Sequence, residues 1–206
     1  LLGGRRTNLA EMMSVLNLPV PHGFTVTTDA CREYMKGGWP KGLDLEIAKQ
    51  VAALEKKMGR KLGNVADPLL VSVRSGAKFS MPGMMDTVLN LGLNDEVVVG
   101  LAEKSGNERF AWDSYRRFIQ MYGDVVLGMK PESKEDIDPF EEIMEALKHK
   151  RGIELDTDFT IQDLKDLVYD FKEAVKKRTG HDFPTDPWDQ LRGAVIAVFN
   201  SWNGDR

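Results

Sequence analysis

Residues 69–76 read LLVSVRSG, and this stretch decides the fold class that the sequence predicts. Leu69 to Val73 is almost continuously apolar, which is typical of a strand covered on both faces. The strand runs directly into Arg74, so an arginine leaves its carboxyl end, where open α/β sheets bind ligands. We therefore expect a mixed α/β fold here, with the Arg74 side chain in a ligand-binding crevice.

The sequence around this strand alternates between helical and extended patterns over residues 1–93, the first expected unit. Its other expected elements are a helix capped by Asn8, a strand at 24–27, a helix from Thr28 through Met35 and a helix at 44–58. The apolar face of the last helix is predicted to hold Leu45, Ala48, Ala52 and Met58. Residues 75–93 contain three glycines and a proline without clean periodicity, which predicts a long functional loop.

From residue 94 onward the pattern is helical. Helices are expected at 95–105, 107–127, 138–150, 160–179 and 187–202. Thr160 is placed to cap the fourth, and Pro187 follows Asp186 in the first turn of the last. Because the last helix is apolar nearly all round, we expect it to be buried between lobes. These patterns predict a helical unit over 94–184 and a returning helix over 185–206.

Composition excludes several classes of protein. The chain of 206 residues is 42% hydrophobic and 29% charged with a net charge of −4, and its only short basic cluster closes a predicted helix, which argues against a nucleic-acid-binding domain. Its single cysteine, Cys31, excludes an internal disulfide and a multi-cysteine zinc site. No apolar run approaches the roughly 20 residues of a membrane span and no secretory leader opens the chain, so we expect a cytoplasmic or organellar protein that is not secreted. Because the chain starts at Leu1 and stops just after an apolar helix, we read it as part of a longer protein.

Two glycine-containing segments carry groups suited to anions. Gly3-Gly4 and the guanidinium of Arg5 stand before a helix N-terminus, where backbone N–H groups and the helix dipole favour an anion, although an ordinary turn fits as well. The segment from Ser80 to Thr87 follows Arg74, and Gly83 in it would let the backbone approach a ligand closely. Methionines are usually core residues, but three of them beside Pro82 and Gly83 in a loop are poorly explained in that way.

A third segment, residues 107–122, places Asp113 three and four positions before Arg116 and Arg117. The spacing predicts an intrahelical ion pair. Adjacent helical residues point about 100° apart, so we expect one arginine to pair with Asp113 while the other faces a cleft. The three histidines stand apart from one another, and the acidic residues form no convincing metal site.

Taken together, these segments resemble the pyruvate, phosphate dikinase family. The matching blocks occur in the family's order at residues 3–12, 19–28, 72–77 and 80–95, and the last of them, SMPGMMDTVLNLGLND, is the most specific. The resemblance implies the N-terminal half of an ATP-grasp domain, with residues 1–93 as its α/β subdomain, 94–184 as an inserted helical subdomain and 185–206 as a helix leading towards the second grasp lobe.

The resemblance also implies ATP and Mg²⁺ as ligands. In the family, the β,γ-diphosphate of ATP passes to a histidine on a separate swivelling domain and a phosphoryl group later reaches pyruvate. The acidic magnesium ligands, the phosphohistidine domain and the pyruvate domain have no counterpart in this sequence. The resemblance therefore implies ATP or AMP and those domains as partners, a homodimer as the intact enzyme, and no turnover by this chain alone.

Carried over by position, the ATP-binding residues form a set of eight, with no catalytic residue and no metal ligand among them. The set is Arg5, Arg74, Gly83, Met84, Met85, Asp86, Thr87 and Arg117. The family's usual Gly-Gly-Lys-Gly is Gly-Gly-Arg-Arg here, which replaces a compact ammonium by a wide fork and a glycine by Arg6. Two alternatives stay open: a regulatory or scaffold domain derived from a dikinase, and a dikinase of the phosphoenolpyruvate synthase type.

Overall fold

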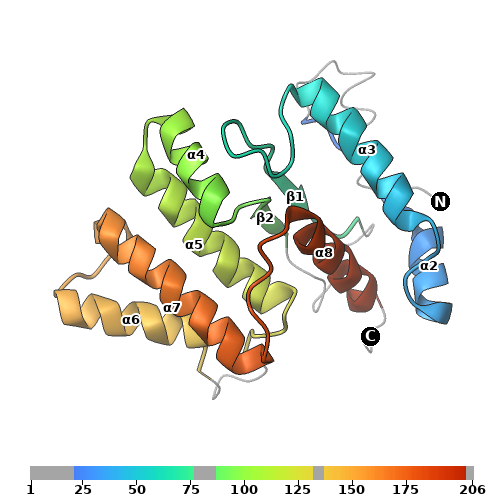
Figure 1. Cartoon of the computed structure of the whole chain (residues 1–206). Coiled ribbons are helices and arrows are strands. Elements are labelled where there is room, and N and C mark those ends of the chain that lie inside the picture. Colours follow the sequence, from blue (N-terminus) through green and yellow to red (C-terminus); the bar gives the residue numbers. More distant parts are fainter. Residues whose placement is uncertain (1–20, 77–86, 132–136, 203–206) are drawn as a thin grey trace, which may run out of the picture.

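A computed structural model describes residues 21–76, 87–131 and 137–202 (Figure 1). Two short strands and seven α-helices are described in these ranges, with one 3₁₀ turn before the sixth of those helices. In chain order they are α2 (Thr28–Gly37), α3 (Leu43–Met58), β1 (Val71–Val73), β2 (Val88–Leu91), α4 (Asp95–Ser105), α5 (Glu108–Val125), α6 (Pro139–Arg151), η1 (Asp156–Asp158), α7 (Ile161–Thr179) and α8 (Pro187–Ser201). The described part of the protein is therefore mostly helical.

The helix boundaries follow their caps. Asn94, Asp138, Thr160 and Asp186 each accept hydrogen bonds from the first free backbone N–H groups of α4, α6, α7 and α8. Pro187 occupies the first turn of α8, where its missing N–H costs nothing. The predicted helices over 95–105, 107–127, 138–150, 160–179 and 187–202 are confirmed to within two residues at each end.

The sheet differs from the sequence expectation. Among the described residues, β1 has a single neighbour, the antiparallel strand β2, with Val71 opposite Leu91 and Val73 opposite Val88. The strand predicted to be covered on both faces is therefore one of a pair, and Ser72 is exposed. Residues 88–91 form β2 although they were expected to be loop, because Val88 and Leu91 are fully buried. The strand expected at 24–27 is absent, since residues 21–27 have no regular structure.

Helix α3 forms as predicted but buries a different face. Leu45 is 77% exposed, and Met58 is exposed as well. The buried stripe consists of Leu43, Ile47, Val51 and Leu54. Both stripes have helical spacing, but the observed one carries the bulkier apolar side chains and begins at Leu43, the first residue of the helix.

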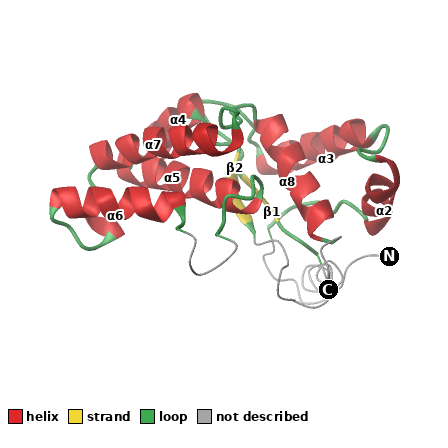
Figure 2. Cartoon of the chain, turned by 90° about the horizontal axis from the view of Figure 1, so that it is seen from below, coloured by secondary structure: helices red, strands yellow, loops and turns green. Residues whose placement is uncertain are grey.

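Helix α5 is the centre of the molecule. It packs against α4, α7 and β2, and its large side chains Tyr115, Phe118, Ile119 and Tyr122 are buried. Seen from below, α6 and α7 lie beside α5 on one side, while α2, α3 and α8 lie beyond the strands on the other (Figure 2). Most of the buried apolar residues on both sides belong to one continuous hydrophobic cluster, from Cys31 to Phe199.

Helix α8 joins the two sides, but it is not buried on all faces. This differs from the expectation that it is buried between lobes. It packs against β1, β2 and α2, while Arg192 and Asn200 are exposed. Its fully buried Gln190 accepts a hydrogen bond from Gly92 N–H at 2.9 Å and donates to the carbonyls of Leu93 and Pro184, both at 2.8 Å. Because every polar group of this side chain has a partner, Gln190 fixes α8 to the turn after β2.

Candidate functional site

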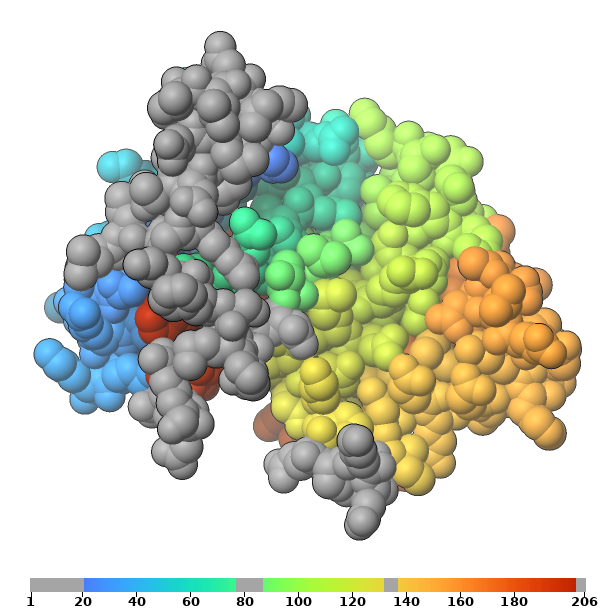
Figure 3. All heavy atoms as spheres, turned by 180° about the vertical axis from the view of Figure 1, so that it is seen from behind, coloured from blue at the N-terminus to red at the C-terminus, as the bar shows by residue number. Residues whose placement is uncertain are grey.

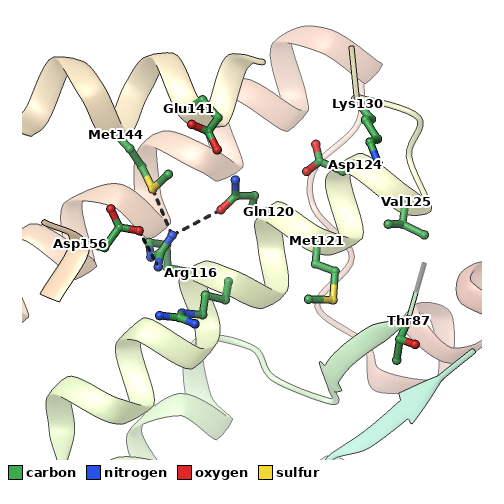
Figure 4. A pocket seen from close by; sticks show the side chains of 11 residues that line it. Thr87, Arg116, Gln120, Met121, Asp124, Val125, Lys130, Glu141, Met144 and Asp156 are labelled. Atoms are coloured by element: carbon green, nitrogen blue, oxygen red, sulfur yellow. Dashed lines mark hydrogen bonds and ion pairs between the residues drawn. The ribbon is translucent and has the colours of Figure 1, made fainter. Parts of the chain in front are cut away.

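A cavity of about 520 Å³ lies where α5 meets α6, η1 and the start of β2 (Figure 4). Its lining comprises Thr87, Arg116, Arg117, Gln120, Met121, Asp124, Val125, Lys130, Glu141, Met144 and Asp156. In the space-filling view of Figure 3, the surface of α5 (yellow-green) adjoins those of α6 and α7 (gold and orange) without a break. We call this cavity the α5–α6 groove.

One face of α5 supplies much of this lining. Arg117, Gln120, Met121 and Asp124 follow one another at helical positions i, i+3, i+4 and i+7, so they share one side of the helix. Sequence analysis singled out only Arg117 of these four. The same spacing, counted forward from Arg117, would have found the other three.

Asp113 connects two arginines at this groove. Its Oδ1 accepts hydrogen bonds from Arg116 Nε at 3.1 Å and Nη2 at 2.8 Å, and its Oδ2 lies 2.9 Å from Arg117 Nε. The predicted intrahelical ion pair is confirmed. The expectation that one arginine pairs with Asp113 while the other faces a cleft is wrong, because both arginines pair with Asp113 and both line the groove.

The two arginines differ in their surroundings. The Arg116 side chain is 2% exposed, and its Nη1 also reaches Gln120 Oε1 at 3.4 Å and Met144 Sδ at 3.1 Å (Figure 4). Arg117 is 59% exposed, and Asp113 is its only ion-pair partner among the described residues. Arg116 is therefore a buried structural cation, whereas the outer end of Arg117 is accessible to a ligand.

η1 closes one end of the groove with Asp156. Arg109 fixes this turn to α5 by donating hydrogen bonds to the carbonyls of Asp156, Thr157 and Phe159. Asp156 lies 2.8 Å from Lys148 Nζ and 3.8 Å from Arg116 Nη2. The hydrogen bond from Lys148 is the main cause that lowers the pKa of Asp156, so this carboxylate is charged and neutralises part of the local positive charge.

Asp124 is the unusual acid of the groove. Burial raises its pKa to about 7, with repulsion from Asp138 and Glu141 acting in the same direction and attraction to Lys130 opposing it. Its buried Oδ1 has no hydrogen-bond partner among the described residues, which costs free energy if the group is ionised. Asp124 is therefore an acid that changes its protonation state near neutral pH.

The structure describes three of the eight residues predicted to bind ATP. Thr87 and Arg117 line the α5–α6 groove, whereas Arg74 is exposed at the end of β1 and does not contribute to this lining. The other five lie outside the described residues: Arg5, Gly83, Met84, Met85 and Asp86. The groove thus brings together two predicted residues from different segments.

Within the three described ranges, no cluster of three or more His, Cys, Asp or Glu side chains is arranged to hold a metal ion. None of the helices described there is long and apolar enough to span a membrane. The lining of the α5–α6 groove combines three cationic side chains, Arg116, Arg117 and Lys130, with three acidic ones, Asp124, Glu141 and Asp156.

Comparison with known proteins gives a consistent result. The family model described as "Pyruvate phosphate dikinase, AMP/ATP-binding domain" matches residues 1–39 and 36–206. Over its full length the chain is 54% identical to pyruvate, phosphate dikinase of Clostridium symbiosum, 55% to the chloroplastic enzyme of Flaveria trinervia and 54% to a chloroplastic enzyme of Zea mays. It covers 23%, 21% and 21% of these relatives, so the chain spans about a fifth of their length.

Proposed function

The chain belongs to the pyruvate phosphate dikinase AMP/ATP-binding domain family, and from this premise we propose that it holds the phosphate groups of ATP between the end of β1 and the α5–α6 groove. The observation that carries the proposal is that Thr87 and Arg117, implicated independently of the structure, line one groove together with Lys130. Arg74, exposed at the end of β1 and outside the lining of the groove, is proposed as a further cationic group of the site.

The chemistry of these groups suits phosphate. A planar guanidinium donates paired, charge-assisted hydrogen bonds to phosphoryl oxygens, and a threonine hydroxyl adds a neutral donor. Phosphoryl transfer depends mainly on positioning and on neutralising charge that spreads over the transferred oxygens. We infer that Arg74 and Arg117 supply fixed positive charge, while Arg5 and residues 83–86 complete the phosphate site.

Magnesium ions bind a few carboxylates together with substrate phosphates. The described residues do not fit a dedicated metal cage: Asp124 is half-buried with acidic neighbours, and no group of three ligands forms. We infer that Mg²⁺ arrives with ATP and takes its carboxylate ligands from another part of the full-length protein.

In the full-length protein, we propose that the β,γ-diphosphate of ATP passes to a histidine of another domain, and that pyruvate and phosphoenolpyruvate are interconverted at a third. ATP or AMP and these domains are the proposed partners, in a homodimeric enzyme of the cytoplasm or an organelle. The identity of 54% and 55% to two pyruvate, phosphate dikinases supports this proposal.

The test is substitution of Arg74 and Arg117 by alanine in the full-length protein. Each lost charge-assisted contact is expected to weaken ATP-dependent phosphorylation of the protein by roughly 10- to 150-fold, which corresponds to about 1.5–3 kcal/mol. Exchange between pyruvate and phosphoenolpyruvate, measured separately, should stay unchanged. Arg32→Ala is the matched control, because Arg32 forms an exposed ion pair with Asp29 outside the lining of the groove. Equal losses in both half-reactions would contradict the proposal.

A further inference from the structure

Asp113 stands behind the groove and not in its lining, yet both of its oxygens are committed to arginines that do line it. Its side chain is 18% exposed. A partly buried carboxylate between two guanidinium groups makes stronger contacts than a fully exposed surface pair. The position of Arg117 at the groove is therefore coupled to Asp113.

Arg116 makes Asp113 rigid. The Arg116 guanidinium is buried and contacts Gln120, Met144 and Asp156 in addition to the Oδ1 of Asp113. A group with partners from α5, α6 and η1 cannot change rotamer without breaking several contacts at once. The position of Oδ1 is thereby fixed, and with it the direction in which Oδ2 faces Arg117.

Arg117 without Asp113 would be an exposed, flexible side chain. An arginine has four rotatable side-chain bonds and loses much rotamer entropy when it is held in one geometry. Asp113 contacts it through Nε at 2.9 Å, and within the described ranges no ion pair involves the two terminal nitrogens, which can therefore meet another anion. The carboxylate therefore contacts the Nε of the guanidinium and leaves Nη1 and Nη2 for a ligand.

We propose that Asp113 is a positioning residue: held by Arg116, it fixes the guanidinium of Arg117 so that its terminal N–H groups face a phosphoryl oxygen in the α5–α6 groove. The inference rests on the proposed function, since it presupposes that Arg117 binds phosphate. The shared chemistry is a phosphoryl oxygen, whether it belongs to ATP or to inorganic phosphate.

A substitution of Asp113 distinguishes positioning from simple electrostatics, because the two predict opposite effects on the binding of an anion. Asp113→Asn removes a negative charge beside the groove, so long-range electrostatics alone would tighten the binding of an anion. Asparagine also keeps one oxygen for Arg116 but no longer attracts Arg117. If Asp113 acts by positioning, Asp113→Asn instead weakens the reaction, since misplacing a catalytic contact by about 1 Å costs up to roughly 100-fold.

The experiment is a double-mutant cycle in the full-length protein with Asp113→Asn, Arg117→Ala and the double variant. ATP-dependent phosphorylation of the protein is measured with labelled ATP, with and without inorganic phosphate, and thermal unfolding is recorded for each variant. We expect Asp113→Asn to lower the rate by about 10-fold or more, and the double variant to match Arg117→Ala alone. Asp29→Asn, which removes an exposed carboxylate from another i,i+3 arginine pair, should leave the rate unchanged.

The outcomes separate the two proposals. An unimpaired Arg117→Ala would overturn the proposed role of Arg117 and this inference with it. An impaired Arg117→Ala together with a normal or faster Asp113→Asn, or additive losses in the double variant, would overturn this inference alone. If Asp113→Asn lowers the phosphorylation rate in the absence of inorganic phosphate, the contact is with the nucleotide. If it changes only the response of the rate to added inorganic phosphate, the contact is with inorganic phosphate. If Asp113→Asn does not fold, the cycle is run with Asp113→Glu, which keeps the charge, displaces it by one methylene and should recover part of the rate.

Discussion

At the scale of single residues, Asp124 makes the clearest prediction. Its folded-state pKa of about 7 lies far above the value of about 3.9 for an exposed aspartate in an unfolded chain. Between these values the folded protein binds more protons than the unfolded chain does. The stability that comes from the neutral carboxyl is therefore fully present below about pH 4 and is lost as pH rises through about 7.

Asp124→Asn should remove this loss, because the amide is neutral at every pH. A pKa raised by about three corresponds to about 4 kcal/mol for a fully buried group, and Asp124 is only partly buried. We therefore expect the stability of Asp124→Asn, relative to the unsubstituted protein, to be about 1–2 kcal/mol greater at pH 8 than at pH 5. Urea unfolding of both proteins at the two pH values measures it. Stability curves that run parallel for the two proteins would contradict the pKa assignment, and Asp29→Asn serves as the exposed control.

The residue scale also shows what helical spacing can and cannot predict. The distances from Asp113 to Arg116 and Arg117 along the sequence correctly predicted ion pairing. They could not predict that the guanidinium of Arg116 also contacts Met144 and Asp156, which come from α6 and η1. Contacts between elements far apart in sequence leave no periodic signal.

At the scale of elements, helices were predictable where their caps are explicit. Thr160 and Asp186 mark the starts of α7 and α8 in the sequence as they do in the structure. β2 was not predictable from its neighbourhood, because four strand residues stand among glycines and a proline that suggest a loop. Its burial comes from packing against α5 and α8, which no local pattern reveals.

The close packing of helix α4 at Gly100 predicts how one added methyl group affects stability. A Cβ added at Gly100 would lie 1.5 Å from the carbonyl oxygen of Val65, so the loop carrying Val65 approaches the helix backbone directly. We expect Gly100→Ala to destabilise the protein by about 1–3 kcal/mol or more, because the loop or the helix must move. Gly37→Ala, also in a helix but with open space around the added Cβ, should be neutral or stabilise by up to about 1 kcal/mol. Chemical denaturation of both variants measures the contrast, and equal effects would contradict the packing of α4.

At the scale of the whole molecule, the helical part was easier to predict than the strands and their surroundings. Residues 95–201 form their helices as expected, and buried residues on both sides of the strands belong to one core. α8 makes this connection through Gln190 and the buried face that follows it. Residue patterns show that α8 is apolar, but not which strand or helix it covers.

The same scale gives the last prediction, which concerns the phosphate acceptor. His22, His149 and His181 are all exposed, and none belongs to the lining of the α5–α6 groove. Transfer requires the acceptor nitrogen within about 3–3.5 Å of the reacting phosphorus and in line with the leaving group. We therefore expect that the full-length protein, incubated with β-labelled ATP and Mg²⁺, carries its phosphohistidine outside residues 1–206.

Peptide mapping by mass spectrometry under alkaline conditions locates the label, since phosphohistidine is lost in acid. A variant with all three histidines replaced by glutamine should keep full labelling, whereas Arg74→Ala should lose most of it. If the label instead maps to His22, His149 or His181, the donor and acceptor lie in the same domain. The groove would then have to open towards that histidine, and the proposed separation of ATP binding from the phosphate acceptor would be wrong.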